Sequence, residues 1–367
     1  MLTHKFSNMI IHTFRLITFQ LNKTLINGMT KISFNKSNIR PYFLIYGSFI
    51  ENEVKKHIEL FKQSRITNYY FAYNPRMLYQ FAIKNRQHSF LLHGMTYACM
   101  CTLAFAGVKL NWICWGAGAS INKRNWKSIL FTPIKILIYH RFYNITTLMV
   151  GDKITLEHDY WLKGVEVLPY YPYTTVHFKD RLIMLNKTDM HKTKLAVLLG
   201  NSANCIDSYY ELFDKLSRFK GLITINCMMQ YPQIDKRTLS DLRNRGEEIF
   251  GKDSFFCDTE MLETEAYFAY MSKFDIYVCG RLGQSGLGAA NTSIILGKKV
   301  FLTGKNLQWM RSRGLFVYDL NDIENGSDSD FFTLLTEEQK KFNFESQFAG
   351  IEEIMDRWIQ YLQKIAN

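Results

Sequence analysis

The stretch Ser89-Phe90-Leu91-Leu92-His93-Gly94 has the pattern of a buried strand that ends at a glycine. A helical stretch follows at 97–106, and Leu110–Trp115 is a second apolar run that ends at Gly116. Short apolar strands alternating with helices are typical of a mostly parallel sheet, and ligands bind at the carboxyl ends of its strands. We therefore predict an α/β fold with His93, Trp115 and Gly116 at a ligand-binding edge.

The same alternation extends in both directions along the chain. Tyr42–Tyr46 predicts the first strand, closed by Gly47 and Ser48, and Leu195–Leu199 opens a second series at Gly200. Further strands of that series are predicted at 222–227, 254–257, 275–279, 299–302 and 315–317. The chain has 367 residues, of which 47% are hydrophobic, and this is enough for two cores.

We predict two domains, an N-terminal one at 41–175 and a C-terminal one at 190–345, joined after a proline-containing run at 168–173. A basic N-terminal extension is predicted at 1–40 and a C-terminal helix at 346–367. Within the extension, 5–22 is predicted to be either a short amphipathic helix at a membrane interface or part of a floppy segment ahead of a start at Met29.

The charge of the chain is uneven. Residues 1–151 hold 19 Lys and Arg against three acids, whereas 152–367 hold the remaining 26 basic residues against 30 acids. No carboxylate occurs from Leu60 to Gly151. This pattern predicts a polyanionic partner for the first half, although a solvated basic face is the simpler alternative. No zinc finger, RRM or KH signature supports nucleic acid, so we expect an anionic membrane surface, and no stretch predicts a transmembrane helix.

A glycine-rich loop, Arg281-Leu-Gly-Gln-Ser-Gly-Leu-Gly288, follows one predicted strand and opens a helix. Glycines let the backbone approach a ligand, and free amides at a helix start attract phosphate. Gln284 and Ser285 add side-chain hydrogen bonds. The loop is neither a Rossmann dinucleotide fingerprint nor a Walker A loop.

With Gly200, Asn201 and Ser202 at another strand end, this loop (Arg281, Gln284, Ser285, Gly286, Leu287 and Gly288) predicts a grip on the two phosphates of a nucleotide sugar. A tight turn and a helix cap are the structural alternatives.

Among residues with chemical potential, His93 is a candidate general base for an acceptor hydroxyl, although a lone histidine is more often structural. Asp328-Ser329-Asp330 resembles a metal-binding DxD motif but lies in a polar loop, so we expect a solvated loop there and no metal site. The seven cysteines are odd in number and mostly lie in apolar runs, which favours buried thiols over disulfides or zinc.

Several short motifs occur in the order and rough spacing of one family. They are His93-Gly94, Trp115-Gly116-Ala117, Gly200-Asn201-Ser202, Tyr231-Pro232, Glu265 with Tyr267, Asp275, Gln284 with Gly286 and Gly288, and Trp309. On these motifs the chain resembles glycosyltransferase family 56 over about residues 42–320. The resemblance adds Tyr231 to the donor-binding candidates, and it implies that Gly47, Ser48, Trp115 and Gly116 face the acceptor.

The resemblance implies a GT-B fold, with two Rossmann-like lobes, parallel sheets and an interdomain cleft. It also implies a TDP-sugar donor, an undecaprenyl-pyrophosphate-linked acceptor, no metal cofactor, and peripheral attachment to the cytoplasmic face of the bacterial inner membrane. Members are described as 4-alpha-L-fucosyltransferases. One member activity is the transfer of N-acetylfucosamine from its TDP-sugar to lipid II in enterobacterial common antigen synthesis. An O-antigen relative that uses another TDP-deoxysugar also fits.

This chain departs from the family pattern at three positions. Phe49 and Gly118 each replace an aspartate, and Gly283 replaces an arginine, with Arg281 two residues upstream. Two other functions stay open at this point. A nucleotide-sugar epimerase with a similar fold leaves the basic first half unexplained, and a non-enzymatic basic membrane-binding module does not need glycine loops at several strand ends.

Overall fold

The computed structural model describes residues 9–16, 19–36, 39, 41–94, 96–116, 119, 129–169, 171, 183, 193–200, 202–203, 206–230 and 234–367. The chain divides into two compact units. Unit 1 comprises Met1–Thr174 together with Gly350–Asn367, and unit 2 comprises Thr175–Ala349. Each unit contains one parallel sheet with helices between its strands, so the predicted α/β class is confirmed.

Unit 1 is built on a seven-stranded sheet with the order β3-β2-β1-β4-β5-β6-β7, in which all neighbouring strands are parallel. The strands are β1 (Ile10–Arg15), β2 (Pro41–Tyr46), β3 (Tyr69–Ala72), β4 (Ser89–His93), β5 (Lys109–Cys114), β6 (Asn144–Thr147) and β7 (Glu166–Val167). The helices are α1 (Phe19–Lys36), α2 (Glu51–Gln63), α3 (Pro75–Lys84), α4 (Tyr97–Phe105), α6 (Thr132–Tyr139), α7 (Val150–Asp159) and α18 (Ile351–Ala366).

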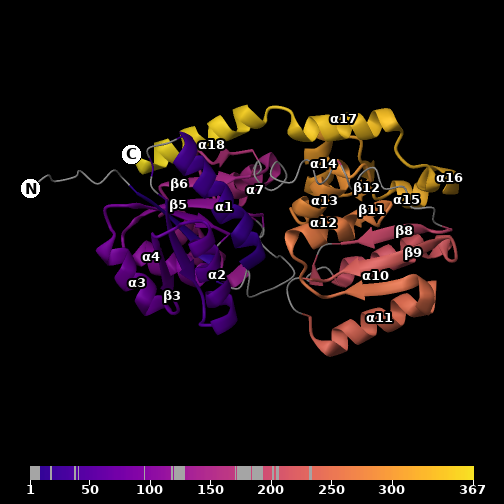
Figure 1. Cartoon of the computed structure of the whole chain (residues 1–367), viewed down its shortest axis with the longest axis horizontal. Coiled ribbons are helices and arrows are strands. Elements are labelled where there is room, and N and C mark those ends of the chain that lie inside the picture. Colours follow the sequence, from indigo (N-terminus) through magenta and orange to yellow (C-terminus); the bar gives the residue numbers. More distant parts are fainter. Residues whose placement is uncertain are drawn as a thin grey trace, which may run out of the picture. The chain divides into compact units, whose positions relative to one another are not determined.

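Helices cover both faces of this sheet (Figure 1). Along β4, Phe90 and Leu92 belong to one core and Leu91 to the other, because successive side chains of a strand point to opposite faces. The first core contains residues of α3, α4, α6 and α7, and the second contains residues of α1, α2 and α18. Since both faces are covered, β4 is buried along its whole length and β1 is buried from Ile10 to Phe14.

The prediction for the first 40 residues is wrong. Ile10–Arg15 forms β1, which lies between β2 and β4 in the middle of the sheet, and 19–36 form helix α1. Ile10, Ile11 and Phe14 are fully buried, so this segment is neither an interfacial helix nor a floppy extension. A strand covered on both faces shows no alternation of polar and apolar residues, and its sequence therefore gave no strand signal.

The C-terminal helix is part of unit 1. The predicted boundary between residues 345 and 346 falls inside α17 (Glu337–Phe348), and α18 begins after Gly350. Trp358 of α18 is fully buried, its indole Nε1 donates to the Pro169 carbonyl oxygen at 3.1 Å, and its ring stacks on Tyr171 at 4.7 Å. Helix α18 therefore completes the second core of unit 1.

Unit 2 has a six-stranded parallel sheet with the order β10-β9-β8-β11-β12-β13. Its strands are β8 (Leu195–Leu199), β9 (Ile223–Met228), β10 (Phe255–Asp258), β11 (Ile276–Cys279), β12 (Lys299–Leu302) and β13 (Tyr318–Asp319). Its helices are α10 (Ile206–Leu216), α11 (Lys236–Phe250), α12 (Thr264–Ser272), α13 (Leu287–Ile295), α14 (Gly304–Ser312), α15 (Asp322–Asn325), α16 (Asp328–Phe332) and α17. The last strand lies one residue after the predicted 315–317.

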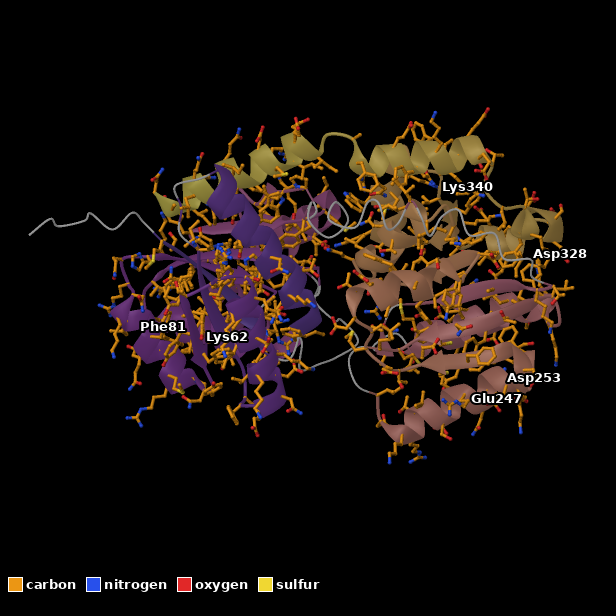
Figure 2. All side chains as sticks on the ribbon, viewed as in Figure 1. Lys62, Phe81, Glu247, Asp253, Asp328 and Lys340 are labelled. Atoms are coloured by element: carbon orange, nitrogen blue, oxygen red, sulfur yellow. The ribbon has the colours of Figure 1, made fainter. Side chains whose placement is uncertain are left out.

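The DxD-like motif has a structural role. Asp328, labelled in Figure 2, begins α16, and its carboxylate forms an ion pair with Arg218 at 3.0 Å. The Asp330 side chain accepts hydrogen bonds from the backbone and hydroxyl of Ser327 and completes a capping box. Local capping thus accounts for these carboxylates. None of the helices in the described ranges is long and apolar enough to cross a bilayer.

Candidate functional site

Each sheet has a switch point, where the strand order changes direction. In unit 1 the chain runs outward through β1, β2 and β3 and then returns to β4 beside β1; in unit 2 it returns to β11 beside β8. Ligands of parallel α/β sheets bind outside the carboxyl ends of the strands at such points. The switch points therefore define the two candidate sites, one in each unit.

In unit 1 the predicted acceptor residues gather at the carboxyl edge of the sheet. Gly47 and Ser48 follow β2, His93 ends β4, and Trp115 and Gly116 follow β5. The edge is tightly packed, since a Cβ at Gly94, whose φ is +55°, would lie 2.3 Å from the Trp115 ring.

A buried chain of hydrogen bonds crosses the unit 1 switch point. Nδ1 of His12 lies 3.2 Å from Nε2 of His93, and Nδ1 of His93 lies 3.0 Å from the Tyr171 hydroxyl. The Trp115 indole donates to the same hydroxyl at 3.2 Å. All three bonds are satisfied when Tyr171 donates to His93 and His93 donates to His12. Since β1 brings His12 to His93, this contact between residues 81 positions apart was not visible in the sequence.

The two histidines are uncharged in the folded protein. Burial lowers the pKa of His12 to about 3, and burial together with the neighbouring His12 lowers the pKa of His93 well below its usual value. His93 is only 1% exposed, it stacks on Phe14 with ring centroids 4.4 Å apart, and both of its ring nitrogens are engaged. A role as general base stays a prediction, and the contacts in this structure fit a residue that positions Tyr171 and Trp115.

These pKa values predict a stability that depends on pH. A histidine whose pKa is lower in the folded state than in the unfolded state stabilises the fold fully above the unfolded value of about 6.5 and loses that contribution as the pH falls. By pH 5 each of His12 and His93 should cost about 2 kcal/mol of the unfolding free energy. Urea unfolding between pH 7.5 and 5 measures this loss.

Between pH 7.5 and 5 the His12→Gln variant should lose about 2 kcal/mol less unfolding free energy than the parent. The control is His158→Gln, because the side chain of His158 is 84% exposed, and this variant should keep the slope of the parent. An unfolding free energy that does not change between pH 7.5 and 5 would contradict the buried neutral pair.

In unit 2 the glycine loop lies at the switch point, and it follows a strand and opens a helix, as predicted. It follows β11, and helix α13 begins at Leu287 with Gly286 as its N-cap at φ +67°. The first helical hydrogen bond runs from the Ala290 amide to the Gly286 carbonyl oxygen at 2.9 Å, so the amides of Leu287, Gly288 and Ala289 have no partner within the helix. Together with the positive end of the helix dipole, they form a site for an anion.

Two residues that the sequence analysis did not identify hold this loop. The Lys305 amide donates to the Leu282 carbonyl oxygen at 2.9 Å, and the side-chain amide of Asn306, itself 1% exposed, donates to the Ser285 carbonyl oxygen. Gly304 has a φ of +58°, and a Cβ there would lie 2.2 Å from the Leu282 carbonyl oxygen. The signal was present, because Gly304 lies two residues after the end of β12, and the other site glycines also lie near strand ends.

The other donor candidates either follow strand β8 or belong to the glycine loop. Gly200 follows β8 beside β11, its amide donates to the Val278 carbonyl oxygen at 2.8 Å, and a Cβ there would lie 2.3 Å from the Tyr209 hydroxyl. Ser202 lies nearby and accepts a hydrogen bond from Tyr209 through its carbonyl oxygen at 3.3 Å. Gln284 and Ser285 are half-buried, whereas Arg281 is exposed. Asn201 and Tyr231 lie outside the described residues, as does Gly118.

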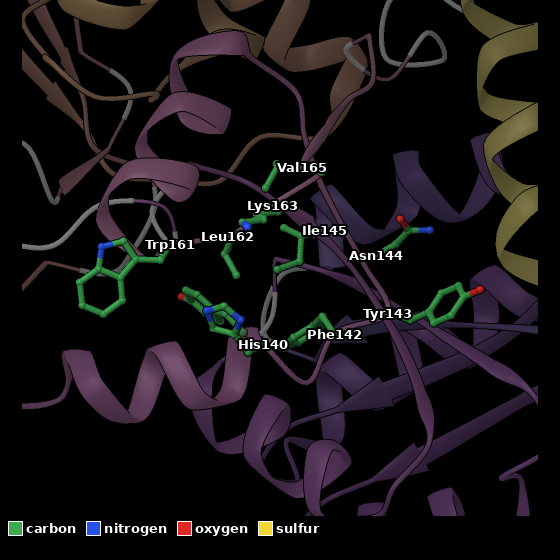
Figure 3. Close-up of a pocket in the computed structure, with 11 residues that line it drawn as sticks. His140, Phe142, Tyr143, Asn144, Ile145, Trp161, Leu162, Lys163 and Val165 are labelled. Carbon is green, nitrogen blue, oxygen red and sulfur yellow. The ribbon is translucent and has the colours of Figure 1, made fainter.

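A cavity of about 280 Å³ lies elsewhere in unit 1 (Figure 3). It is lined by Tyr139, His140, Phe142, Tyr143, Asn144, Ile145, Trp161, Leu162, Lys163, Gly164 and Val165. Asn144 is the first residue of β6, so the cavity is at the amino edge of the sheet, opposite the switch point. None of the predicted site residues lines it.

A comparison with known families decides what these two sites belong to. The model of the 4-alpha-L-fucosyltransferase family, glycosyl transferase group 56, matches residues 52–325. The chain belongs to glycosyltransferase family 56. It is therefore a glycosyltransferase, and the resemblance found in its motifs is confirmed.

Several solved structures have a fold similar to that of this chain. Anabaena HepE in complex with UDP and glucose has a TM-score of 0.68 at 9% identity, covering 97% of this chain and 100% of that chain. A glycosyltransferase from Rickettsia africae has a TM-score of 0.63 at 12% identity, covering 98% of each chain. The UDP-GlcNAc 2-epimerase of Neisseria meningitidis bound to UDP-GlcNAc has a TM-score of 0.56 at 12% identity, covering 97% and 100%. At these identities the likeness shows the fold alone, which is the predicted GT-B class of glycosyltransferases and epimerases.

Proposed function

We propose that this family 56 enzyme transfers a deoxy-acetamido sugar, such as 4-acetamido-4,6-dideoxygalactose, from a TDP-sugar to a polyprenyl-pyrophosphate-linked saccharide. The product is an intermediate of a bacterial surface polysaccharide, either enterobacterial common antigen or an O-antigen. The observation that carries this proposal is the family match, which includes the glycine loop that opens α13. HepE and the epimerase of Neisseria meningitidis were solved with uridine nucleotides, which supports a nucleotide-sugar donor here.

In this proposal the donor diphosphate lies at the N-terminus of α13. The amides of Leu287 and Gly288 bind its oxygens, and the guanidinium of Arg281 adds a positive charge. Electrostatic stabilisation of the departing TDP by these groups lowers the barrier to glycosyl transfer, so that no pair of catalytic carboxylates is required. We expect the transfer to be independent of a metal ion, because the helix dipole and Arg281 supply the charge that a metal supplies in other transferases.

The acceptor is proposed to meet unit 1. The segment of unit 1 from Leu60 to Gly151 has a positive net charge and contains no carboxylate. A positively charged surface attracts the pyrophosphate of a lipid-linked acceptor. We propose peripheral attachment to the cytoplasmic face of the inner membrane on the same ground.

The test is a reaction with TDP-4-acetamido-4,6-dideoxygalactose and a polyprenyl-pyrophosphate-linked disaccharide, in the presence of EDTA. TDP should form only when both substrates are present, and mass spectrometry should detect a glycolipid heavier by one sugar residue. Conversion of the donor into an isomer without acceptor would favour the epimerase alternative, for which the shared fold is the only support. Absence of any donor turnover with acceptors of this class would overturn the proposal.

A further inference from the structure

The outer face of helix α6 is apolar. Leu130, two residues before the helix, and Ile134 and Leu137 within it have side chains that are 67%, 49% and 70% exposed. They are spaced i, i+4 and i+7, so they form one stripe along a helix. Arg141 lies in the turn after the helix and is exposed.

The opposite face of α6 already packs in the core of unit 1. Ile138 and Tyr139 belong to the first core cluster, and the Tyr139 hydroxyl donates to the Tyr97 hydroxyl of α4 at 3.2 Å. The helix is therefore fixed by its inner face, and its outer stripe contributes nothing to that core. A surface helix normally carries polar residues on its outer side, so a rigidly held apolar stripe indicates a contact surface.

The charge around this stripe selects its partner. The segment 60–151 contains eleven Lys and Arg and no Asp or Glu. They are Lys62, Arg65, Arg76, Lys84, Arg86, Lys109, Lys123, Arg124, Lys127, Lys135 and Arg141. An apolar stripe within a segment whose charged residues are all positive matches a surface that is apolar inside and anionic outside, which is the head-group layer of an anionic bilayer. A second copy of this chain would bring equally positive surfaces together.

We propose that α6 is the membrane-inserting element of this enzyme, with Leu130, Ile134 and Leu137 buried at the boundary between head groups and acyl chains and Arg141 paired with lipid phosphate. This inference deepens the proposed function, which requires a lipid-linked acceptor, by assigning the contact to one helix face. Three of the eleven basic residues, Lys123, Arg124 and Lys127, lie outside the described residues.

The test uses flotation with vesicles of phosphatidylcholine alone and of phosphatidylcholine with phosphatidylglycerol. The full-length protein should bind the anionic vesicles, and Leu130→Ser/Ile134→Ser/Leu137→Ser should reduce its partition coefficient by about tenfold or more. The matched control is Leu222→Ser/Phe256→Ser/Met261→Ser, because these three side chains of unit 2 are also exposed and apolar. It should float as the parent does.

TDP binding and thermal unfolding are measured on every variant, so that loss of the fold is distinguished from loss of membrane binding. If the triple variant unfolds, the single variant Leu137→Ser replaces it, because Leu137 is the most exposed side chain of the stripe. Unchanged flotation of the variants would overturn the proposal. Failure of the parent protein to float with the anionic vesicles would overturn it as well. A change from dimer to monomer with unchanged flotation would assign the stripe to self-association. These outcomes are independent of which sugar the enzyme transfers.

Discussion

Replacing Gly288 with valine is expected to lower the affinity for TDP by about a hundredfold, the equivalent of losing one or two hydrogen bonds to a charged phosphate. Gly288 is the second residue of α13, it is exposed, and its backbone is helical. A branched side chain there would stand where the diphosphate approaches the free amides. Isothermal titration with TDP measures the affinity, and urea unfolding measures the stability.

The matched control for Gly288→Val is Gly151→Val. Gly151 is also the second residue of a helix, α7, but it belongs to unit 1. The two substitutions carry the same intrinsic helix cost, so their stabilities should change by similar, small amounts. Only Gly288→Val should weaken TDP binding. Equal TDP affinities in the two variants would remove α13 from the donor site.

Replacing Gly304 with alanine is expected to destabilise unit 2 by about 3 kcal/mol and to abolish TDP binding at micromolar concentrations. The new Cβ would lie 2.2 Å from the Leu282 carbonyl oxygen, which is backbone and cannot rotate away. Relief of this clash must move residues 282–285, and the hydrogen bond from the Lys305 amide to Leu282 would break. Urea unfolding and titration with TDP measure the two effects.

Gly314→Ala separates the clash from backbone strain. Gly314 also has a positive φ, +74°, but its nearest neighbour beyond the adjoining residues would be the Phe342 ring at 3.8 Å, an ordinary contact. This variant should cost only about 1 kcal/mol, the strain of an alanine in the left-handed region, and it should bind TDP as the parent does. If both variants lose the same stability, the contact between Gly304 and Leu282 does not hold the loop.

Much of the fold was predictable, because it follows from local patterns. Leu195–Leu199 was predicted as a strand and forms β8 with the same bounds, and the glycine loop was predicted to open a helix that begins at Leu287. A continuous apolar run that ends at glycine has few other structures available in a parallel sheet. The glycine loop was predictable for the same reason, since glycines at a strand end are a local signal.

The residues around His93 were only partly predictable. The sequence indicated that His93, Trp115 and Gly116 lie at strand ends, and the structure places them at one edge. It gave no indication of His12, because β1 is hidden in a segment with mixed apolar spacing and no glycine at its end. Because β1 was not predicted, the position of the switch point in unit 1 could not be predicted. The hydrogen bond between His12 and His93 could not be predicted either.

The sequence by itself determined the α/β class, the uneven charge of the two halves, the glycine loop before α13 and the family. Local patterns, residue counts and the order of short motifs can all be determined without knowing which distant segments are in contact. Only the tertiary structure decided that β1 lies between β2 and β4, that α18 returns to unit 1, and that the outer face of α6 is exposed. The physical reason is that local patterns specify which residues favour burial, whereas strand pairing and the covering of a helix face depend on contacts between distant segments.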